Sequence, residues 1–356
     1  MEIKMEVRDD DLSKFEAEGA VSLPVTEDQG YISNNGARIW YATYGSGPAV
    51  ILLHGGLGHG GNWGYQVPAL VRSGYQAVLI DSRGHGRSTR DARPFSYERM
   101  ASDVLAVMDG LDLQSAGLVG WSDGACTALV LAAKAPARVA GVFFFACNMD
   151  PSGVKPFEAT PTLNRCFARH AKDYARLSAT PEHFKDFVED VSLMQRTQPN
   201  YTAQDLARIS VPVLIVQSEH EEFIRREHAE YLAKAIPGAE FIVLSEVSHF
   251  APLQRPEQFN TAMLEFVGKI LPKEAPMVQA ELRQANRPWL NSHETRANPA
   301  PNVDILVRSC LRKKNSSIAP SSTSTSSSTT SSLWSTPCTT WPTPRVTPPA
   351  PPTSTT

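Results

Sequence analysis

The run Gly120-Trp121-Ser122-Asp123-Gly124 limits what this chain can fold into more than any other stretch. The apolar residues 116–119 before it are typical of a short buried strand, and the small residues 125–133 after it are typical of a helix. A serine in a tight turn between a strand and a helix needs neighbours without side chains, because the two elements close on the turn. The spacing therefore predicts a nucleophile elbow, with the Ser122 hydroxyl above a sheet and the Asp123 N–H at the positive end of a helix.

The rest of the chain up to about residue 271 alternates between strands and helices, which predicts an α/β fold with a mostly parallel sheet. Two strand-like segments, 30–33 and 37–44, are joined by an Asn-Gly turn, so the sheet should begin antiparallel. Uniformly apolar runs, typical of strands buried on both faces, follow at 49–53, 76–80, 116–119, 138–146, 211–216 and 240–244. Helices are expected at 97–111, 125–133, 226–236 and 256–271.

The alternation stops between about residues 148 and 208, where two helical segments, 161–177 and 181–197, follow each other without a strand. Such an insertion over the strand ends predicts a small helical lid. Its large apolar side chains either line a pocket or pack down on the core, and spacing does not separate these two roles. They are Phe157, Leu163, Phe167, Phe184, Phe187, Leu193 and Met194.

We therefore expect one α/β domain over residues 21–272, with the lid inserted into it. Residues 1–20 form an N-terminal extension with one short amphipathic helix at about 12–18. Residues 273–356 are polar, and the last part is almost entirely Ser, Thr and Pro. This composition buries too little apolar surface to offset its ordering entropy, so the tail is expected to be disordered.

Composition excludes several function classes. The chain has 356 residues, 42% of them hydrophobic, which is enough for a large core. A formal net charge of -3 and the lack of basic runs interleaved with aromatics argue against a nucleic-acid partner. No apolar run approaches the roughly 18 residues of a membrane span, and residues 1–20 do not resemble a secretory signal, so a cytoplasmic location without a membrane partner is expected. The five cysteines show no metal or disulfide spacing.

A serine hydroxyl becomes a nucleophile at neutral pH only if a base takes its proton, and that base needs a carboxylate to fix its tautomer. His249 is the best base, because it follows the last predicted strand and comes after both serine and acid in the chain. The acid is the less certain member. Glu219, Glu221 and Glu222 compete after the preceding strand; Glu221 is favoured, three residues past an expected turn at Ser218, and Asp150 is the alternative.

The loop 54–61 after the strand 49–53 contains a formal G-x-G-x-x-G match, and Asp81 lies about twenty residues further on. A dinucleotide site would use the same features. The preceding His54-Gly55 and the position of the loop well inside the sheet favour a different interpretation, an oxyanion loop in which the Gly56 N–H joins that of Asp123.

Two further histidines could carry chemistry. His85, in the charged and glycine-rich turn 81–88, is expected to be structural, among ion-pair partners. His220 stands among glutamates, but no second histidine lies at helical spacing and zinc prefers three or four convergent ligands. We therefore expect no metal and no cofactor.

Together these motifs resemble the α/β-hydrolase fold enzymes over residues 30–271. They are HGG at 54–56, DSRGHGRS at 81–88, GWSDG at 120–124 and SHF at 248–250. GWSDG is similar to the biphenyl hydrolase-like (valacyclovir hydrolase) enzymes, and DSRGHGRS to enol-lactonases and related esterases. The resemblance implies Ser122 as nucleophile, His249 as base, and the amides of Gly56 and Asp123 as an oxyanion hole. The chain departs from the family pattern at the acid: the family usually has an aspartate after a glycine, whereas this chain has Ser218 and Glu221.

The function that follows is a cofactor-free serine hydrolase acting on a small carboxylic ester or lactone through an acyl-enzyme. Trp121 and Phe250, within the motifs, and Leu57, directly after HGG, are expected to contact the substrate. The resemblance also suggests that Asp123 could hold a substrate ammonium, as in an α-amino-acid ester hydrolase, although it could equally cap the helix after the elbow. The same scaffold also supports carbon–carbon bond hydrolases and non-catalytic ligand-binding proteins, so these two functions stay open, as does the oligomeric state.

Overall fold

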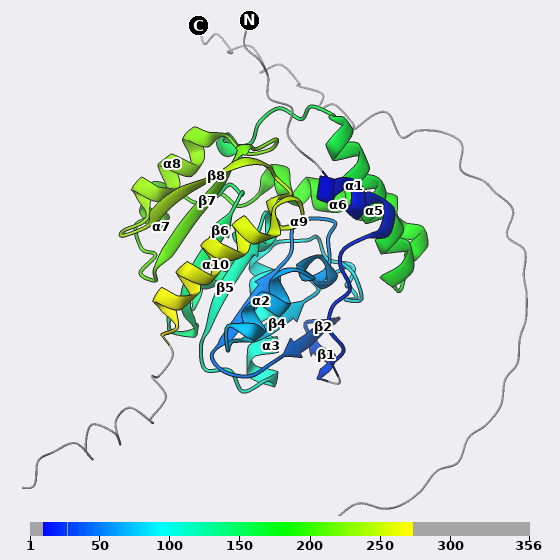
Figure 1. Ribbon diagram of the computed structural model, residues 1–356, viewed down its shortest axis with the longest axis horizontal. Helices are drawn as coiled ribbons and strands as arrows, with labels where there is room; N and C mark the ends of the chain where they lie inside the picture. The colour runs from blue at the N-terminus through cyan, green and yellow to red at the C-terminus, as the bar shows by residue number, and fades with distance from the viewer. Residues whose placement is uncertain (1–9, 27, 273–356) are drawn as a thin grey trace, which may run out of the picture. The chain divides into compact units, whose positions relative to one another are not determined.

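The computed structural model describes residues 10–26 and 28–272. Its centre is an eight-stranded sheet of order β1-β2-β4-β3-β5-β6-β7-β8 (Figure 1). The strands are β1 (Gln29–Asn34), β2 (Ala37–Tyr44), β3 (Ala49–Leu53), β4 (Gln76–Ile80), β5 (Ala116–Trp121), β6 (Val139–Phe145), β7 (Val213–His220) and β8 (Glu240–Ser248).

The first two strands run antiparallel to each other, and β2 is antiparallel to β4, whereas every pairing from β4 through β3 to β8 is parallel. The Asn-Gly hairpin turn between β1 and β2 is confirmed, because Asn35 and Gly36 have φ of 47° and 81°. The central strands β3 and β5 are buried along their whole length. The predicted α/β architecture with a mostly parallel sheet is confirmed.

Helices cover both faces of the sheet (Figure 1). One face carries α3 (Tyr97–Gly110), α4 (Asp123–Lys134) and α8 (Arg226–Ala235), whose apolar residues share one core cluster. The other face carries α2 (Gln66–Arg72), α9 (Ala251–Gln254) and α10 (Pro256–Ile270), which share a second cluster. The sheet therefore separates two cores, and side chains alternate between them along each strand.

The segment predicted as a lid contains α5 (Pro161–Leu177) and α6 (Phe184–Thr197), a short 3-10 turn at Pro181–His183 between them, and α7 (Ala203–Leu206). Of its apolar side chains, Leu163, Phe187 and Met194 are buried in the core, whereas Phe157 and Leu193 are 40% and 49% exposed. The short N-terminal helix is also present, as α1 (Asp10–Glu18). It packs against α5 and α9, with Leu12 and Phe15 buried.

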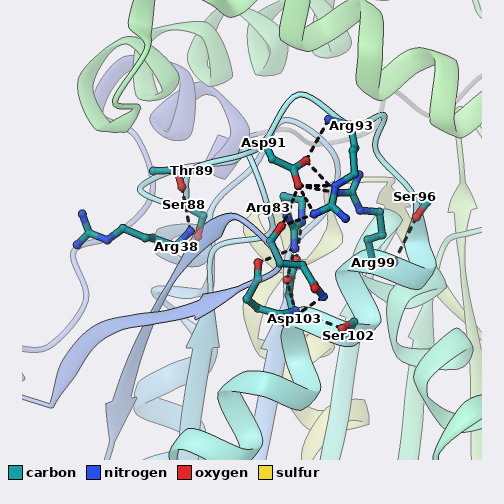
Figure 2. Close-up of polar contacts among 12 residues, drawn as sticks. Arg38, Arg83, Ser88, Thr89, Asp91, Arg93, Ser96, Arg99, Ser102 and Asp103 are labelled. Atoms are coloured by element: carbon teal, nitrogen blue, oxygen red, sulfur yellow. Dashed lines mark hydrogen bonds and ion pairs between the residues drawn. The ribbon is translucent and has the colours of Figure 1, made fainter.

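The turn after β4 is fixed by a buried ion pair. Arg83, 1% exposed, donates through Nε and Nη2 to the two carboxylate oxygens of Asp103 on α3, at 3.0 and 2.6 Å. Figure 2 shows this pair together with Asp91, which also binds Arg93 and Arg99. The planar guanidinium and the carboxylate bind at two points, so they set the orientation of the turn as well as its distance from α3.

Several predictions lie outside the described residues. These are the disordered tail 273–356 with Cys310 and Cys338, and the first nine residues. Over the described ranges, no helix combines the length and the apolar character that crossing a bilayer requires.

Candidate active site

Ser122 occupies a strained turn between β5 and α4, with φ 53° and ψ -123°. A Cβ on Gly120 would lie 2.4 Å from Ala125 Cα, and one on Gly124 would lie 2.0 Å from the carbonyl oxygen of Leu53. Both distances are far inside van der Waals contact, so only glycine fits at either position. The steric reason for the G-x-S-x-G spacing is thereby confirmed, and the strain holds the serine in the conformation of a nucleophile elbow.

His249 and Glu221 lie side by side because β7 and β8 pair to their ends, with His220 opposite Ser248. Glu221 directly follows His220 at the end of β7, and His249 directly follows Ser248 at the end of β8. The Glu221 carboxylate oxygen Oε1 lies 2.6 Å from Nδ1 of His249, and both residues are 5% exposed. Such a contact fixes which ring nitrogen carries the proton and leaves Nε2 to act as a base.

The prediction of a turn at Ser218 is wrong, because β7 continues to His220. The register shifts between Ser218 and His220, where β8 contains two more residues than β7, and the Ser218 hydroxyl donates to the carbonyl of Ser248 at 2.7 Å. The strand is therefore longer than its apolar run, since the pairing with β8 continues beyond the buried residues. Because β7 extends to His220, Glu221 lies beside His249, where its side chain, one methylene longer than that of aspartate, contacts the imidazole ring.

The other carboxylates have different partners. Glu219 accepts a hydrogen bond from the N–H of Glu246 at 2.8 Å, and Glu222 accepts one from the N–H of His249 at 2.7 Å. Asp150 binds the N–H of Ser152 and faces His228, whose Nδ1 lies 3.8 Å away. Of the carboxylates considered from sequence, Glu221 is the one that contacts the imidazole ring of His249.

Burial disfavours the protonated form of His249, but the negative charges of Glu221 and Glu222 outweigh it and raise the pKa of the imidazole above its ordinary value. A raised pKa makes the histidine a stronger base.

Aromatic rings enclose the imidazole of His249. Phe223 is nearest, with ring centroids 4.6 Å apart, and Phe250 and Trp121 follow at 5.7 and 6.1 Å. Trp121 and Phe250 are each 3% exposed and contact each other, so they support the ring from the core side. Their expected contact with substrate, like that of Leu57 in the loop after β3, stays a prediction.

Trp121 directly precedes Ser122, so its contact with His249 brings the elbow and the histidine to the same end of the sheet. Within the described residues, no hydrogen bond joins the Ser122 hydroxyl to His249. Catalytic hydrogen bonds are often long before substrate binds and tighten in the reacting complex. The structure thus brings base and acid into contact, and it places the serine elbow at the same end of the sheet.

The loop after β3 approaches the elbow closely, as an oxyanion loop requires. A Cβ on Gly55 would lie 3.2 Å from Cβ of Ser122, and one on Gly56 would lie 2.6 Å from Oδ2 of Asp123. Asp123 is the first residue of α4, so its N–H has no acceptor within the helix.

The structure does not support a dinucleotide site, because its acidic residue, Asp81, is engaged in contacts within the protein. Asp81 is fully buried, and it accepts hydrogen bonds from the N–H of Gly60 at 2.6 Å and the N–H of Arg87 at 2.8 Å. A carboxylate bound in this way holds two loops together and is not directed at a ribose hydroxyl.

The Asp123 carboxylate is buried and does not cap its own helix. Within the described part of the chain, its oxygens accept from the hydroxyl of Tyr97 at 2.8 Å and from Nε2 of Gln195 at 3.0 Å. Burial raises the pKa of Asp123, while the two hydrogen bonds oppose the rise. Sequence reasoning missed both partners, since nothing in the helical pattern of α3 or α6 separates Tyr97 or Gln195 from other residues on these helices.

His54 and His85, also at this end of the sheet, make contacts within the protein. Burial lowers the pKa of His54 to about 4 and that of His85 to about 3, so both are neutral. The His85 ring packs on Phe187 and bonds to the carbonyl of Arg83 at 2.9 Å. The expected structural role of His85 agrees with these contacts, but its neighbours are aromatic rings and not the ion-pair partners that the sequence suggested.

Comparison with known proteins identifies the class. A family model described as the alpha/beta hydrolase fold matches residues 48–165. Together with the sheet order and the elbow, this match confirms the predicted α/β-hydrolase fold. The chain is a hydrolase of that fold.

The relatives to which the chain is similar are named as hydrolases or as an enzyme that degrades a lactone. The chain is 28% identical over 249 residues to serine hydrolase BPHL of Homo sapiens, covering 66% of this chain and 85% of the relative. It is 27% identical over 264 residues to a 2-hydroxy-6-oxononadienedioate/2-hydroxy-6-oxononatrienedioate hydrolase of Paraburkholderia phymatum, covering 65% and 91%. The solved structure of Est816, an N-acyl homoserine lactone degrading enzyme, superposes with a TM-score of 0.52 at 28% identity, covering 67% of this chain and 100% of Est816.

Proposed function

We propose that this chain hydrolyses a small carboxylic ester or lactone through an acyl-enzyme, with Ser122 as nucleophile, His249 as base and Glu221 as acid. The observation that carries the proposal is the 2.6 Å contact between Glu221 and His249 beside a strained serine elbow. Relatives named as a serine hydrolase and a lactone-degrading enzyme support the substrate class.

In the first half-reaction His249 Nε2 takes the proton of the Ser122 hydroxyl as Oγ attacks the carbonyl carbon. The N–H groups of Gly56 and Asp123 stabilise the oxyanion of the tetrahedral intermediate. His249 then gives the proton to the leaving oxygen, and the ester bond to Ser122 remains. In the second half water repeats the attack with the same base, and the carboxylic acid and free Ser122 are released.

The segment 148–208 acts in this proposal as a lid over the reacting groups. Gln195 of α6 donates to the Asp123 carboxylate next to the elbow, and Phe223 stacks near the partly exposed Phe157 in that segment. These contacts support an apolar wall for the acyl or leaving group near His249. Small or apolar esters therefore suit the site better than charged ones.

The test is turnover of p-nitrophenyl butyrate and of a γ-lactone by the intact chain and by Ser122→Ala. The variant is expected to lose at least about 10³-fold in kcat, because removal of the nucleophile leaves only binding and the oxyanion hole. Ser245→Ala is the matched control, since this exposed serine accepts a 3.3 Å hydrogen bond from Gln258 and lies outside the triad. Wild-type turnover by Ser122→Ala would refute the proposal.

A second candidate, an α-amino-acid ester hydrolase, is favoured by the position of Asp123. Its buried carboxylate lies against the loop that carries Gly56, within reach of an amine next to the scissile carbonyl. A kcat/KM ratio for matched p-nitrophenyl esters with and without an α-ammonium measures this preference. A ratio above about 10 that falls in Asp123→Asn supports the amino-ester function, and a ratio near 1 excludes it.

A further inference from the structure

Two successive glutamates, Glu221 and Glu222, both bind the same histidine. The first contacts the ring, with Oε1 at 2.6 Å from Nδ1 of His249. The second contacts the main chain, with Oε2 accepting from the backbone N–H of His249 at 2.7 Å. The imidazole is thus held by one carboxylate through its ring and by another through its backbone.

The Glu222 carboxylate lies in surroundings that disfavour its negative charge. Burial raises the pKa of Glu222 to about 7, and the neighbouring charge of Glu221 adds to this rise, whereas the hydrogen bond from His249 and the charge on its ring oppose it. A backbone N–H can be satisfied by any neutral oxygen, without the cost of a second charge. The choice of a carboxylate therefore calls for a role beyond anchoring.

Resting on the proposed function, we propose that Glu222 is a positioning residue for His249. It fixes the main chain that carries the imidazole, and its negative charge, added to that of Glu221, stabilises the imidazolium that forms in each half of the reaction. The proton itself travels only between Ser122, His249 Nε2 and the leaving oxygen, so Glu222 neither takes nor gives one.

The groups around this arrangement come from three other elements. Cys166 of α5 is within the electrostatic influence of Glu222, whose charge adds to the burial that raises the pKa of this thiol. Lys155 donates to the carbonyl of Glu221 at 2.6 Å, and Asp123 adds its negative charge to those acting on His249. A change at Glu222 therefore alters one charge in a set in which Glu221 and Asp123 stay in place.

The experiment compares Glu222→Leu, Glu222→Gln and Glu219→Gln in the full chain, using p-nitrophenyl butyrate over pH 5 to 9. Leucine removes the acceptor, whereas glutamine keeps an acceptor and removes only the charge. Glu219→Gln is the matched control, because Glu219 is exposed and accepts from Glu246, not from the histidine. Thermal unfolding of each variant reports on folding.

Glu222→Leu is expected to lose about 10-fold or more in kcat with KM within 2-fold, because a displaced base costs turnover more than binding. Glu222→Gln should recover kcat at high pH to within about 3-fold. Its acid limb in kcat/KM should move to lower pH, because the imidazolium loses a neighbouring negative charge. The shift is limited, since a Glu222 pKa of about 7 leaves this carboxylate only partly ionised over the limb. Glu219→Gln should match the wild type.

An unshifted acid limb in Glu222→Gln, or wild-type kcat in Glu222→Leu, would overturn the positioning role. If Glu222→Leu does not fold, the acid limb of Glu222→Gln alone decides. These results are separable from failure of the proposed function, which would appear as activity in Ser122→Ala. An inactive Ser122→Ala beside an unaltered Glu222→Gln rejects only the positioning role of Glu222.

Discussion

Shortening Glu221 by one methylene tests whether the length of this side chain sets the geometry of the base. In Glu221→Asp, the 2.6 Å contact from carboxylate to Nδ1 of His249 would lengthen to about 4 Å, since one C–C bond spans about 1.5 Å. A separation of that size is no hydrogen bond. The imidazole would lose the partner that fixes its tautomer, although a carboxylate charge would remain nearby.

We expect kcat for p-nitrophenyl butyrate to fall about 10²-fold in Glu221→Asp, because a displacement of about 1 Å in a catalytic group costs that much. Glu221→Gln keeps the reach but removes the charge and can present the wrong hydrogen-bonding group, so a fall of up to about 10⁴-fold is expected. The larger loss in the isosteric variant separates the role of charge and tautomer from that of length. Steady-state kinetics at pH 8 and thermal unfolding of both variants provide the measurement.

The reasoning fails if Glu221→Asp retains wild-type kcat together with wild-type thermal stability. That result would mean that the pairing of β7 and β8 does not hold the two residues at a fixed separation. Wild-type kcat in Glu221→Gln would remove Glu221 from the triad altogether.

Three further outcomes follow from the geometry. The raised pKa of His249 places the acid limb of kcat/KM above the ordinary value of 6.5, so activity should decline as pH falls through that midpoint, and a midpoint below 6.5 would contradict it. Asp103→Ala removes the two-point carboxylate partner of the buried Arg83 and leaves only Asp91, at 3.6 Å, so the free energy of unfolding should fall by about 3 kcal/mol, the lower end of the range for breaking a buried pair; in urea titrations, a loss under about 1 kcal/mol would be inconsistent with the pair being desolvated. Gly124→Ala places a Cβ 2.0 Å from a backbone oxygen and should abolish soluble folded protein, whereas Gly268→Ala, whose Cβ would meet no atom within 3.8 Å, should be neutral or stabilise α10 by up to about 1 kcal/mol.

Much of the fold could be predicted because its strands are local and strongly apolar. The runs 49–53 and 76–80 coincide with β3 and β4, and the helix expected at 161–177 coincides with α5. Where strand pairing continues beyond the apolar residues, the pattern stops too early. β7 and β8 therefore extend to His220 and Ser248, four residues past the predicted ends at 216 and 244.

The candidate site also contains residues that could be predicted from local sequence and contacts that could not. A serine between two glycines has a local steric signature, so Ser122 and its turn could be found from sequence. The contacts of Gln195 and Tyr97 with Asp123 join residues 72 and 26 positions apart, and no local pattern marks them. The hydrogen bond from the backbone N–H of His249 to Glu222 depends on the register of β7 against β8, which spacing alone does not fix.

Labelling with a fluorophosphonate tests most directly whether Ser122 is a nucleophile activated by His249. Mass spectrometry of the digested intact chain should find the phosphonate adduct on the peptide that contains Ser122, and the rate of labelling should fall by at least about 10²-fold in His249→Ala. An adduct on another residue, or equal labelling rates with and without the imidazole, would contradict the account.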